Sequence, residues 1–393
     1  MKLIIIANRL PVRVQKGDDG KIKMIRSEGG LATGLSSLET DVETHWVGWP
    51  GIFTDDPQEI AEITRQLQEM HFHPVFLTDD QIQNYYEGYS NSTIWPLCHY
   101  FYTYIEYEAR YWEAYWQVNR LFCEKACEQT QSGDIIWVHD YQLMLLPKML
   151  RDAKDGLNIG YFHHIPFPSY ELFRILPERA DILNGLLGAD MIAFHTHGYM
   201  RHFVSTVERV MGLQFDLDKV LQGNRLIQVD SLPMGINYQM YHNAIENPEV
   251  RKNADRLRKE YGNYKLILSV DRLDYSKGIM HRLKGFERFL DDNPNFHEKV
   301  SLAMVVVPSR SNVVRYAKLK KNIDEAIGGI NGRYSTLNWT PIHYFYHGLA
   351  FEELVALYYI ADIALVSPLR DGMNLVAKEY VATKRDNPGV LIL

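Results

Sequence analysis

The stretch that most constrains the fold of this chain is ADIALVSPLRDGMNLVAKEYVAT, at residues 361–383. Its aliphatic run at 363–366 predicts a buried parallel strand, and the Arg-Asp-Gly sequence at 370–372 predicts a tight polar turn. The apolar spacing over 373–383 then predicts a helix. A strand, a glycine-containing turn and a helix start form the arrangement with which α/β proteins bind anions.

Two carboxylates in this stretch predict a second kind of contact. Asp371 and Glu379 are eight residues apart, about two helical turns, so both can face one ligand. A carboxylate in the turn and another along the helix suit hydroxyl-rich groups such as a sugar and a ribose. The alternative is a turn aspartate and a solvated glutamate, and the spacing alone leaves both interpretations open.

The alternation of strand and helix continues through the chain. Asp56-Pro57 predicts the start of a helix that runs to about His71, and another helix is predicted over 351–360. This pattern favours two layered α/β halves, a domain over 1–235 and another over 236–393. Buried strands are predicted over 2–7, 134–140, 158–164, 189–194, 226–236, 265–271, 301–307, 342–347 and 389–393.

Length and charge limit the class of protein. The chain has 393 residues, enough for two domains, and its 46% hydrophobic and 23% charged content is ordinary for a soluble globular protein. The net charge of −7 argues against a general nucleic-acid surface, so we expect no nucleic-acid partner. Any anion site must then be a local cluster of arginine and lysine.

The N-terminus and the cysteines predict the compartment. Polar residues follow the apolar run at 2–7 too soon for a signal peptide or a membrane span, so no membrane partner is expected. Cys123 and Cys127 lie on a helix-like stretch, and the third cysteine, Cys98, does not supply a second ligand pair for zinc. These features favour a reduced, cytoplasmic protein.

Several predicted strands end in ionisable residues, and ligands of open α/β sheets bind at the carboxyl ends of strands. Arg9 follows the first predicted strand, Asp140 ends the second and His164 ends the third. Arg272 and Lys277 bracket the loop after a later strand, which predicts a diphosphate clamp. The alternatives are a surface salt bridge for Arg9, a structural histidine, and a solvated loop.

Two further stretches are weaker signals. Gly29-Gly30 precedes a helix predicted at about 32–38, where backbone N–H groups can cradle a diphosphate, but a lone glycine pair is not specific. Residues 85–116 are dense in tyrosine and tryptophan. Most of these must be core residues, while aromatic rings with polar tips also line sugar sites.

Together the motifs of this chain resemble one family along its whole length, from residue 1 to 393. They are ANRLP at 7–11, GGLATG at 29–34, YYEGYSNSTIWP at 85–96, HDYQLMLLP at 139–147, HIPFPS at 164–169, SVDRLDYSKGI at 269–279, PSR at 308–310, INGRY at 330–334 and SPLRDGMNLVAKEYVA at 367–382. In these motifs and their order the chain resembles the trehalose-6-phosphate synthases, which are retaining glycosyltransferases with two Rossmann-like domains (GT-B). The motifs at 269–279 and 367–382 are the most specific.

The resemblance implies a fold and a reaction. The expected fold is GT-B, with two Rossmann-like α/β/α domains that face a central cleft, the first binding the acceptor and the second the donor. The expected reaction transfers glucose from UDP-glucose, or another nucleotide glucose, to C1 of glucose-6-phosphate. Its products are α,α-trehalose 6-phosphate and UDP, with retention of the anomeric configuration.

The resemblance also assigns residues. Arg9, Tyr86, Trp95 and Arg310 would bind the phosphate and sugar of the acceptor, and Asp140 would orient it. The expected donor-binding residues are Gly30, His164, Arg272, Lys277, Asp371, Gly372, Met373, Asn374, Leu375, Val376 and Glu379. The expected catalytic residues are Asp140, His164, Arg272, Lys277 and Asp371.

Within that donor set the resemblance implies distinct roles. His164 and Asp371 would bind the donor glucose, and Glu379 the ribose. Arg272 and Lys277 would stabilise the leaving diphosphate, a role that a metal has in other transferases, so no metal and no other cofactor is expected. The implied mechanism is front-face, with the leaving phosphate taking the acceptor proton.

The chain departs from the family at both ends. The N-terminal loop at 12–28 is longer than in the shortest members. The family continues with helices beyond the strand on which this chain stops, so we expect a fragment or a longer protein, one alternative being an attached or separate trehalose-phosphate phosphatase. The oligomeric state stays open, a homo-oligomer included.

Two other functions remain as alternatives. One is a related synthase with another phosphorylated acceptor, such as glycerol 3-phosphate or a pseudo-sugar phosphate. The other is a non-catalytic sugar-phosphate sensor, although such proteins usually lose donor-site residues, and this chain keeps Arg272, Lys277, Asp371 and Glu379.

Overall fold

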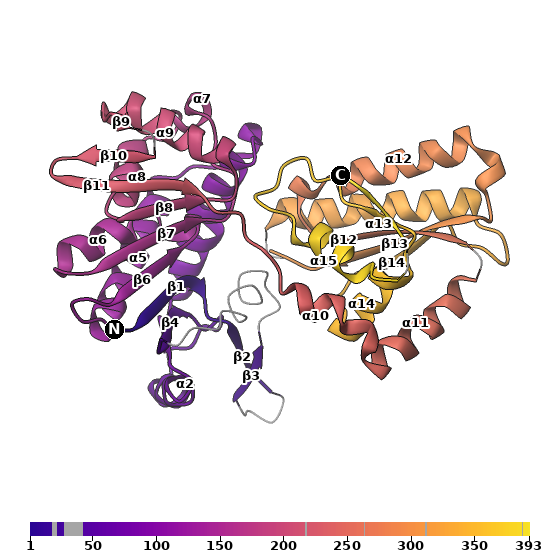
Figure 1. Cartoon of the computed structure of the whole chain (residues 1–393), viewed down its shortest axis with the longest axis horizontal. Helices are drawn as coiled ribbons and strands as arrows, with labels where there is room; N and C mark the ends of the chain where they lie inside the picture. Colours follow the sequence, from indigo (N-terminus) through magenta and orange to yellow (C-terminus); the bar gives the residue numbers. More distant parts are fainter. Residues whose placement is uncertain (18–21, 27–41, 217, 263, 311–312, 387) are drawn as a thin grey trace. The chain divides into compact units, whose positions relative to one another are not determined.

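The computed structural model of this chain contains two compact units, Met1–Met234 and Gly235–Leu393 (Figure 1). The boundary expected from the sequence lies one residue further along. Both units are α/β with largely parallel sheets, which confirms the expected fold class. No described helix combines the length and the apolar character needed to span a lipid bilayer. The structure describes residues 1–17, 22–26, 42–216, 218–262, 264–310, 313–386 and 388–393.

The first unit is built on one sheet with β1 near its centre. In the described residues β1 pairs in parallel with β4 on one side and β6 on the other, and the antiparallel pairs of this sheet are β11–β10 and β10–β9. In spatial order the strands are β5 (Phe72–Pro74), β4 (Thr44–Trp49), β1 (Leu3–Arg9), β6 (Ile135–His139), β7 (Asn158–His163), β8 (Met191–Phe194), β11 (Arg225–Ser231), β10 (Lys219–Gln222) and β9 (Phe215–Asp216).

Helices connect these strands and pack against the sheet (Figure 1). Alternate residues of β1 point to opposite faces, and Ile5 and Ala7 form one apolar cluster with Ile63 and Leu67 of α2. The helical segments are α2 (Pro57–Gln68), α3 (Asp79–Gln81), η1 (Ile82–Ile94), α4 (Trp95–Cys98), η2 (Tyr102–Tyr104), α5 (Ala109–Gln129), η3 (Tyr141–Leu143), α6 (Leu146–Ala153), α7 (Tyr170–Phe173), α8 (Arg179–Leu186) and α9 (His197–Met211).

The start of α2 confirms the predicted cap. The Asp56 side chain accepts a hydrogen bond from the Gln58 N–H at 2.8 Å, and proline occupies the first helical position. The helix ends at Gln68, three residues before the predicted end, because the chain turns there and His71 takes a left-handed φ of 59°. That turn leads directly into β5.

The aromatic-rich stretch adopts a conformation that its sequence did not predict. Residues Ile82–Ile94 form the π-helix η1, which carries Tyr85, Tyr86 and Tyr89. Such wide turns are rare and concentrate at functional sites. The expected N-terminal loop at 12–28 is also partly regular, since β2 (Val12–Lys16) pairs antiparallel with β3 (Ile22–Arg26).

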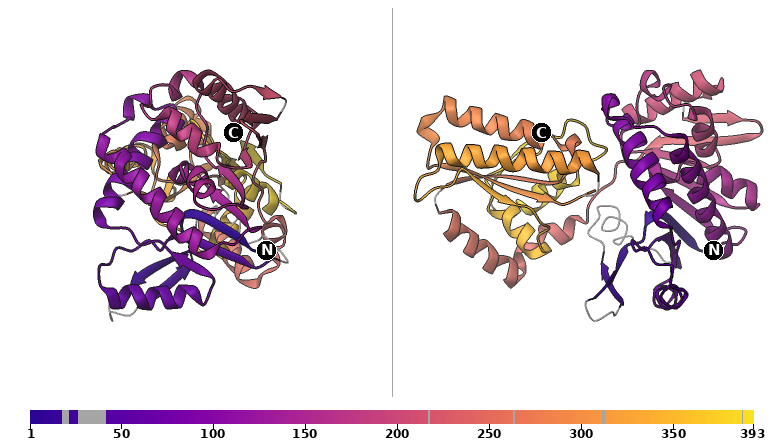
Figure 2. Two further views of the ribbon diagram at one scale, coloured as in Figure 1. Left: turned by 90° about the vertical axis from the view of Figure 1, so that its left-hand side faces the viewer. Right: turned by 180° about the vertical axis from the view of Figure 1, so that it is seen from behind.

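The second unit has a sheet of parallel strands with helices on both faces. Ala303 and Val305 of β13 belong to a cluster with α11, α14 and α15, while Leu302 and Met304 belong to one with α12 and α13. Figure 2 shows α12 and α13 side by side. In spatial order the strands are β14 (Ile342–Phe345), β13 (Val300–Val307), β12 (Lys265–Arg272), β15 (Ile363–Leu365) and β16 (Val390–Ile392).

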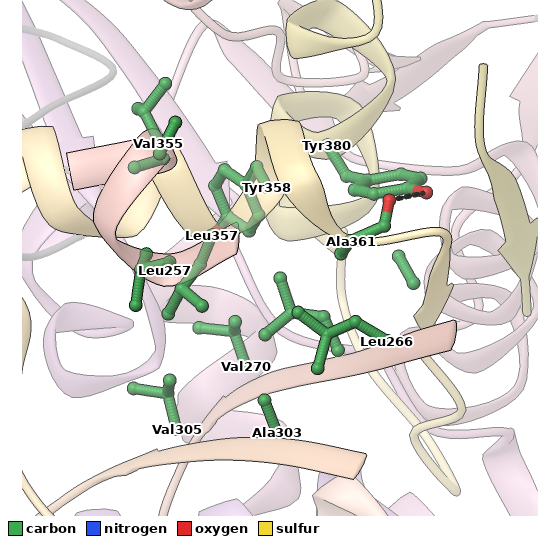
Figure 3. Close-up of a cluster of buried hydrophobic side chains, with 14 of the residues drawn as sticks. Leu257, Leu266, Val270, Ala303, Val305, Val355, Leu357, Tyr358, Ala361 and Tyr380 are labelled. Carbon is green, nitrogen blue, oxygen red and sulfur yellow. Dashed lines mark hydrogen bonds between the residues drawn. The ribbon is translucent and has the colours of Figure 1, made fainter. Parts of the chain in front are cut away.

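One buried cluster of this unit holds the predicted strand–turn–helix stretch in place. Figure 3 shows Tyr358 of α14 and Tyr380 of α15 beside Leu266 and Val270 of β12, and the Tyr380 hydroxyl donates to the Ala361 carbonyl at 3.2 Å. The remaining helical segments are α10 (Tyr238–His242), η4 (Ala244–Glu246), α11 (Pro248–Tyr261), η5 (Tyr275–Lys277), α12 (Ile279–Asp292), η6 (Pro294–Phe296), α13 (Val314–Tyr334), α14 (Phe351–Ile360) and α15 (Leu375–Thr383).

Predicted element ends differ from the observed ones for identifiable reasons. The strand predicted over 226–236 ends at Ser231, before a proline that cannot donate to a sheet. The loop predicted at 272–278 contains the single turn η5. The helix predicted from Met373 begins two residues later, because the Asn374 side chain caps it by accepting from the Ala377 N–H. The helix predicted at about 32–38 lies outside the described residues.

Candidate active site

The first unit gathers polar side chains at one edge of its sheet. Arg9 ends β1, while Asp140, His164 and His195 come directly after β6, β7 and β8, which are neighbours in that order. Because these strands are parallel, their carboxyl ends meet at one edge, where open α/β sheets bind ligands. Three of these four residues were candidates on sequence grounds, and His195 was not.

Arg9 lies against two aromatic rings that also contact each other. Its guanidinium carbon is 3.9 Å from the ring centroid of Trp49 and 5.4 Å from that of Tyr86. Cation–π contact uses the faces of the guanidinium, whereas a phosphate binds at its N–H edge. Gly51 has a φ of 82°, and an added Cβ there would lie 2.5 Å from Arg9 Nη1, so a side chain at this position would displace the guanidinium from its present place. The arrangement holds an exposed cation in one orientation.

Tyr86 and Trp95, the two aromatic residues expected beside Arg9, occupy different surroundings. Tyr86 lies on η1, edge-on to Trp49 with 5.8 Å between ring centroids, and therefore joins the Arg9 cluster. Trp95 opens α4 and is only 4% exposed. Its ring stacks on His99 at 4.1 Å and lies near Tyr141.

Asp140 and His164 are joined through the backbone. The N–H of Asp140 donates to the Phe162 carbonyl at 2.8 Å, and Asp140 Oδ1 accepts from the His164 N–H at 3.1 Å. Asp140 has a φ of 74°, a conformation that non-glycine residues rarely adopt and that is common at functional sites. The carboxylate is therefore fixed at the end of β6 and faces the loop that follows β7.

Three histidine rings lie close together near Asp140. His139 Nδ1 and His164 Nε2 are 2.9 Å apart, and the ring centroid of His195 is 5.4 Å from that of His164. Burial lowers the pKa of His139 to about 3. Burial and the neighbouring histidines also hold the pKa of His164 well below its usual value. His164 is therefore a neutral imidazole at neutral pH, suited to a hydrogen bond with a hydroxyl and not to proton donation.

The second unit brings Lys277 and Asp371 into direct contact. Lys277 Nζ donates to Asp371 Oδ2 at 2.6 Å, with side-chain exposures of 10% and 19%. Asp371 also accepts from the N–H of Gly372 at 2.9 Å and from the side-chain amide of Asn374 at 3.3 Å. The cation predicted for the diphosphate and the carboxylate predicted for the sugar thus form one group, and Arg272 is exposed at the end of the neighbouring β12.

Backbone contacts join the two turns that carry this pair. The N–H groups of Leu369 and Arg370 donate to the Ser276 carbonyl at 2.8 Å and 3.4 Å. Gly278 has a φ of 69°, and an added Cβ would lie 2.6 Å from the Ser367 carbonyl oxygen. The turn after β12 and the turn after β15 therefore fit against each other only with glycine at 278.

Arg310 lies in the second unit and is paired there. Its Nη1 donates to Asp274 Oδ2 at 3.0 Å, and both side chains are almost fully buried. Asp274 also accepts from the Tyr316 hydroxyl and from the Ser276 N–H. Arg310 is thereby connected to the same turn that ends in Lys277.

The remaining donor candidates lie along the start of α15. Glu379 accepts a hydrogen bond from the Tyr358 hydroxyl at 2.8 Å, and burial raises the pKa of its carboxyl group. Gly30 lies outside the described residues. Met373 and Asn374 precede the helix, and Leu375 and Val376 form its first turn.

Some residues that shape the site gave no signal in the sequence. Trp49 is the nearer of the two rings on Arg9, and His195 adds an imidazole beside His164. Arg282 of α12 is buried, pairs with Asp271, and donates to the Lys277 carbonyl. Nothing in the sequence indicated that Arg282 is buried, and the tertiary structure explains its burial by the ion pair with Asp271.

Comparison with known proteins gives the chain relatives along its full length. The model of glycosyltransferase family 20 matches residues 1–393. The α,α-trehalose-phosphate synthase [UDP-forming] 1 of Aspergillus niger is 42% identical over 100% of this chain and 77% of its own length. The bifunctional trehalose-6-phosphate synthase/phosphatase of Thermoproteus tenax is 42% identical over all of this chain and 54% of its own length.

A solved structure agrees with these sequence relatives. The α,α-trehalose-phosphate synthase (UDP-forming) of Burkholderia xenovorans in complex with glucose-6-phosphate superposes with a TM-score of 0.88 at 30% identity. The alignment covers 100% of this chain and 84% of that one.

Proposed function

The chain belongs to glycosyltransferase family 20, and from this membership we infer that it is a UDP-forming α,α-trehalose-phosphate synthase. It transfers glucose from UDP-glucose to C1 of glucose-6-phosphate and retains the anomeric configuration. The names of its full-length relatives and the glucose-6-phosphate complex of a structural neighbour support this reaction. Within the structure, the observation that carries the proposal is the Lys277–Asp371 pair in two interlocked turns.

For the donor, Lys277 and Asp371 act together. An ammonium group has three N–H donors, so Lys277 can keep Asp371 and still donate to a diphosphate oxygen. Asp371 has lone pairs left for hydroxyl groups of the donor glucose. Arg272 supplies a second cation, and Glu379 binds the ribose hydroxyls. The loop Gly372–Asn374 and the first turn of α15 contact the rest of the donor.

For the acceptor, the fixed Arg9 of the first unit binds the phosphate. Arg310, which forms an ion pair within the second unit, remains the other residue expected for the acceptor. Tyr86 adds a hydroxyl group to the phosphate site, and Trp95 contributes to the part of the site that binds the acceptor sugar. Asp140 accepts a hydrogen bond from the acceptor and orients it. The fixed guanidinium of Arg9 supports this assignment, because an arginine already held in place loses little conformational freedom when it binds a phosphate.

The proposed chemistry needs no covalent intermediate. As the bond from C1 to the diphosphate breaks, Arg272 and Lys277 stabilise the negative charge that develops on the leaving UDP. That leaving phosphate oxygen takes the proton of the acceptor hydroxyl as the new bond forms on the same face. Neutral His164 hydrogen-bonds a donor hydroxyl. These cations perform the charge stabilisation for which other transferases use a metal, so we propose that transfer is metal-independent.

The experiment that tests the function is UDP release from UDP-glucose with and without glucose-6-phosphate. We expect acceptor-dependent release and a product with the mass and retention time of trehalose 6-phosphate. Glycerol 3-phosphate in place of glucose-6-phosphate should give no release. Release with glycerol 3-phosphate alone would favour the other acceptor class, and ligand binding without any release would favour a sensor.

The mechanism has its own test. Intact-protein mass spectrometry after incubation with UDP-glucose should find no glycosyl adduct on the wild type or on the Asp140→Asn and Asp371→Asn variants. An adduct on any carboxylate would replace the front-face mechanism with a covalent one.

We further propose a cytoplasmic protein that works beside a trehalose-phosphate phosphatase. The free cysteines of the chain support a reducing compartment. The joined synthase and phosphatase of the Thermoproteus tenax relative support the phosphatase partner. A homo-oligomer is compatible with these features, and the mass of the purified protein by light scattering tests it.

A further inference from the structure

A second cluster of ionisable residues lies at the other edge of the first sheet. Glu43 comes directly before β4, His45 is its second residue, and His71 comes directly before β5. The two strands are parallel, with Trp46 opposite Phe72, so their amino ends meet. The candidate active-site residues follow carboxyl ends, about 20 Å away across the length of a six-residue strand.

The three side chains already bring their ligand atoms together. One nitrogen from each histidine and one oxygen of Glu43 lie within 4.8 Å of one another. His45 Nε2 is 2.7 Å from Glu43 Oε1, and His71 Nδ1 is 4.0 Å from the same oxygen. In a tetrahedral zinc site, bonds of about 2.1 Å hold neighbouring ligand atoms about 3.4 Å apart. His45 is buried, so the exposed side chains of Glu43 and His71 would make the adjustment, by about an ångström and a half at most.

A fourth residue, His73, contacts the ring nitrogen of His45 that does not face Glu43. His45 Nδ1 is 2.8 Å from Nε2 of His73, and the two rings are stacked with 6° between their planes. A histidine that binds a metal through Nε2 keeps its proton on Nδ1 and donates it to an acceptor, a role that Nε2 of a neutral His73 can fill. Both His45 and His73 are buried, so this partner is fixed.

A backbone hydrogen bond fixes the position of His71, and the side chains of Glu43 and His71 are accessible to solvent. The Trp46 N–H donates to the His71 carbonyl at 3.0 Å, which holds the His71 backbone against β4. Glu43 and His71 are themselves more than half exposed, with side-chain exposures of 51% and 56%, so an ion can reach them from solvent. The simpler interpretation is that Glu43 and His45 form a hydrogen bond and that the cluster binds no ion. A metal titration distinguishes this interpretation from a metal site.

We propose that Glu43, His45 and His71 form a binding site for a borderline divalent cation such as Zn²⁺, with His73 as the supporting partner of His45. Two imidazoles and one carboxylate suit Zn²⁺ and do not suit Mg²⁺, which prefers oxygen ligands. The ion joins the amino end of β4 to the turn before β5 and stabilises the folded first unit by binding it preferentially. The site takes no part in glucosyl transfer.

The test is a Zn²⁺ titration of the full chain after treatment with a chelator and removal of that chelator. We expect one equivalent to bind by competition with a chromogenic chelator and the thermal midpoint to rise, whereas Mg²⁺ leaves the midpoint unchanged. His71→Ala should lose this equivalent, and Glu43→Gln should weaken binding at least tenfold. The matched control is His347→Ala, which removes an exposed histidine of the second unit and should bind as the wild type does.

Two further readouts separate a built site from binding by scattered surface histidines. Co²⁺ should give the intense visible bands of a tetrahedral site with wild type and with His347→Ala, and not with His71→Ala. His73→Asn, which cannot mimic the ring, should weaken Zn²⁺ binding about 10–100-fold without abolishing it. Failure of Zn²⁺ to saturate, or equal affinity in the His71 and His347 variants, would overturn the proposal. UDP release should be the same with and without chelator.

Discussion

At the scale of single residues, the site depends on how two cations are held. Arg9 is an exposed cation fixed by the aromatic rings of Trp49 and Tyr86, and Lys277 is a buried cation fixed by a carboxylate. In the part of the chain that the structure describes, no carboxylate pairs with Arg9, so its charge can serve a phosphate. The carboxylate of Asp371 keeps the mostly buried Lys277 charged. Their replacements should therefore have different consequences.

Arg9→Gln should raise the KM for glucose-6-phosphate about 10–100-fold, because it removes charge-assisted hydrogen bonds to a phosphate. The KM for UDP-glucose should change less than threefold, and the thermal midpoint should stay within a degree or two. Steady-state kinetics with each substrate varied in turn measures both constants. Arg65→Gln is the control, since Arg65 is an exposed arginine of α2 with only surface carboxylate partners. Equal effects on both KM values would argue against a phosphate role for Arg9.

Lys277→Met should lower the free energy of unfolding by about 1–3 kcal/mol, because it leaves the mostly buried Asp371 carboxylate without its cation. The double variant Lys277→Met with Asp371→Asn should regain part of that stability and none of the activity. Urea unfolding and UDP release measure the two properties. The exposed pair Lys265–Asp362 is the control, and Lys265→Met should cost almost nothing. If the double variant regained activity, the cation would be structural only.

At the scale of elements, the second unit positions the donor groups through two turns that fit closely together. The turn after β12 and the turn after β15 share backbone hydrogen bonds at Ser276, and their separation is set by the missing side chain of Gly278. Each turn is followed by a helix, so the loop geometry is fixed by two strands and two helices. A change at this contact should move Lys277 relative to Asp371.

Gly278→Ala should reduce stability by about 2–4 kcal/mol and raise the KM for UDP-glucose, because the added methyl group meets a backbone oxygen in a left-handed residue. Gly212→Ala is a matched control. Gly212 ends α9 with a φ of 67°, and nothing lies within 4 Å of an added Cβ. This control should cost about 1 kcal/mol for the backbone alone. Similar losses in the two variants would mean that the contact with Ser367 does not matter.

At the scale of the whole molecule, buried histidines make the stability of the first unit dependent on pH. Burial lowers the pKa of His139 and of His163 to about 3, and the pKa of His164 is also held well below its usual value. The unfolded chain binds protons at these residues near pH 6.5, and the folded chain does not. Protonation therefore favours unfolding over the interval between those pKa values.

The free energy of unfolding should be highest above pH 6.5 and should fall as the pH is lowered toward 4. At pH 5, His139 and His163 should each cost about 2 kcal/mol relative to pH 7, and His164 should act in the same direction. Urea unfolding at pH 7.5, 6 and 5, monitored by tryptophan fluorescence, measures this slope. Carboxylates with ordinary pKa values protonate mainly below this window, whereas the raised pKa of the Glu379 carboxyl group in the second unit acts in the opposite direction. A stability that stayed constant between pH 7.5 and 5 would show that these rings are protonated in the folded protein.

The sequence by itself determined the class of the fold and much of the chemistry at the ends of strands. Runs of aliphatic residues with polar residues after them predict parallel strands and the ligand edge, because burial on both faces requires a continuous apolar strand. Asp56-Pro57 predicted the start of α2 for a similarly local reason. Lys277 and Asp371 were recognised as candidates from their local motifs.

Only the tertiary structure decided which of these residues meet. Lys277 and Asp371 are far apart in the chain, and their contact depends on β12 and β15 being neighbours in the sheet. Trp49 became the partner of Arg9 for the same reason, since β1 and β4 pair side by side. The π-helix η1 packs against α5, a contact between separate elements that local propensity does not predict. Contacts between distant segments are set by strand order and packing, which local patterns of residues do not encode.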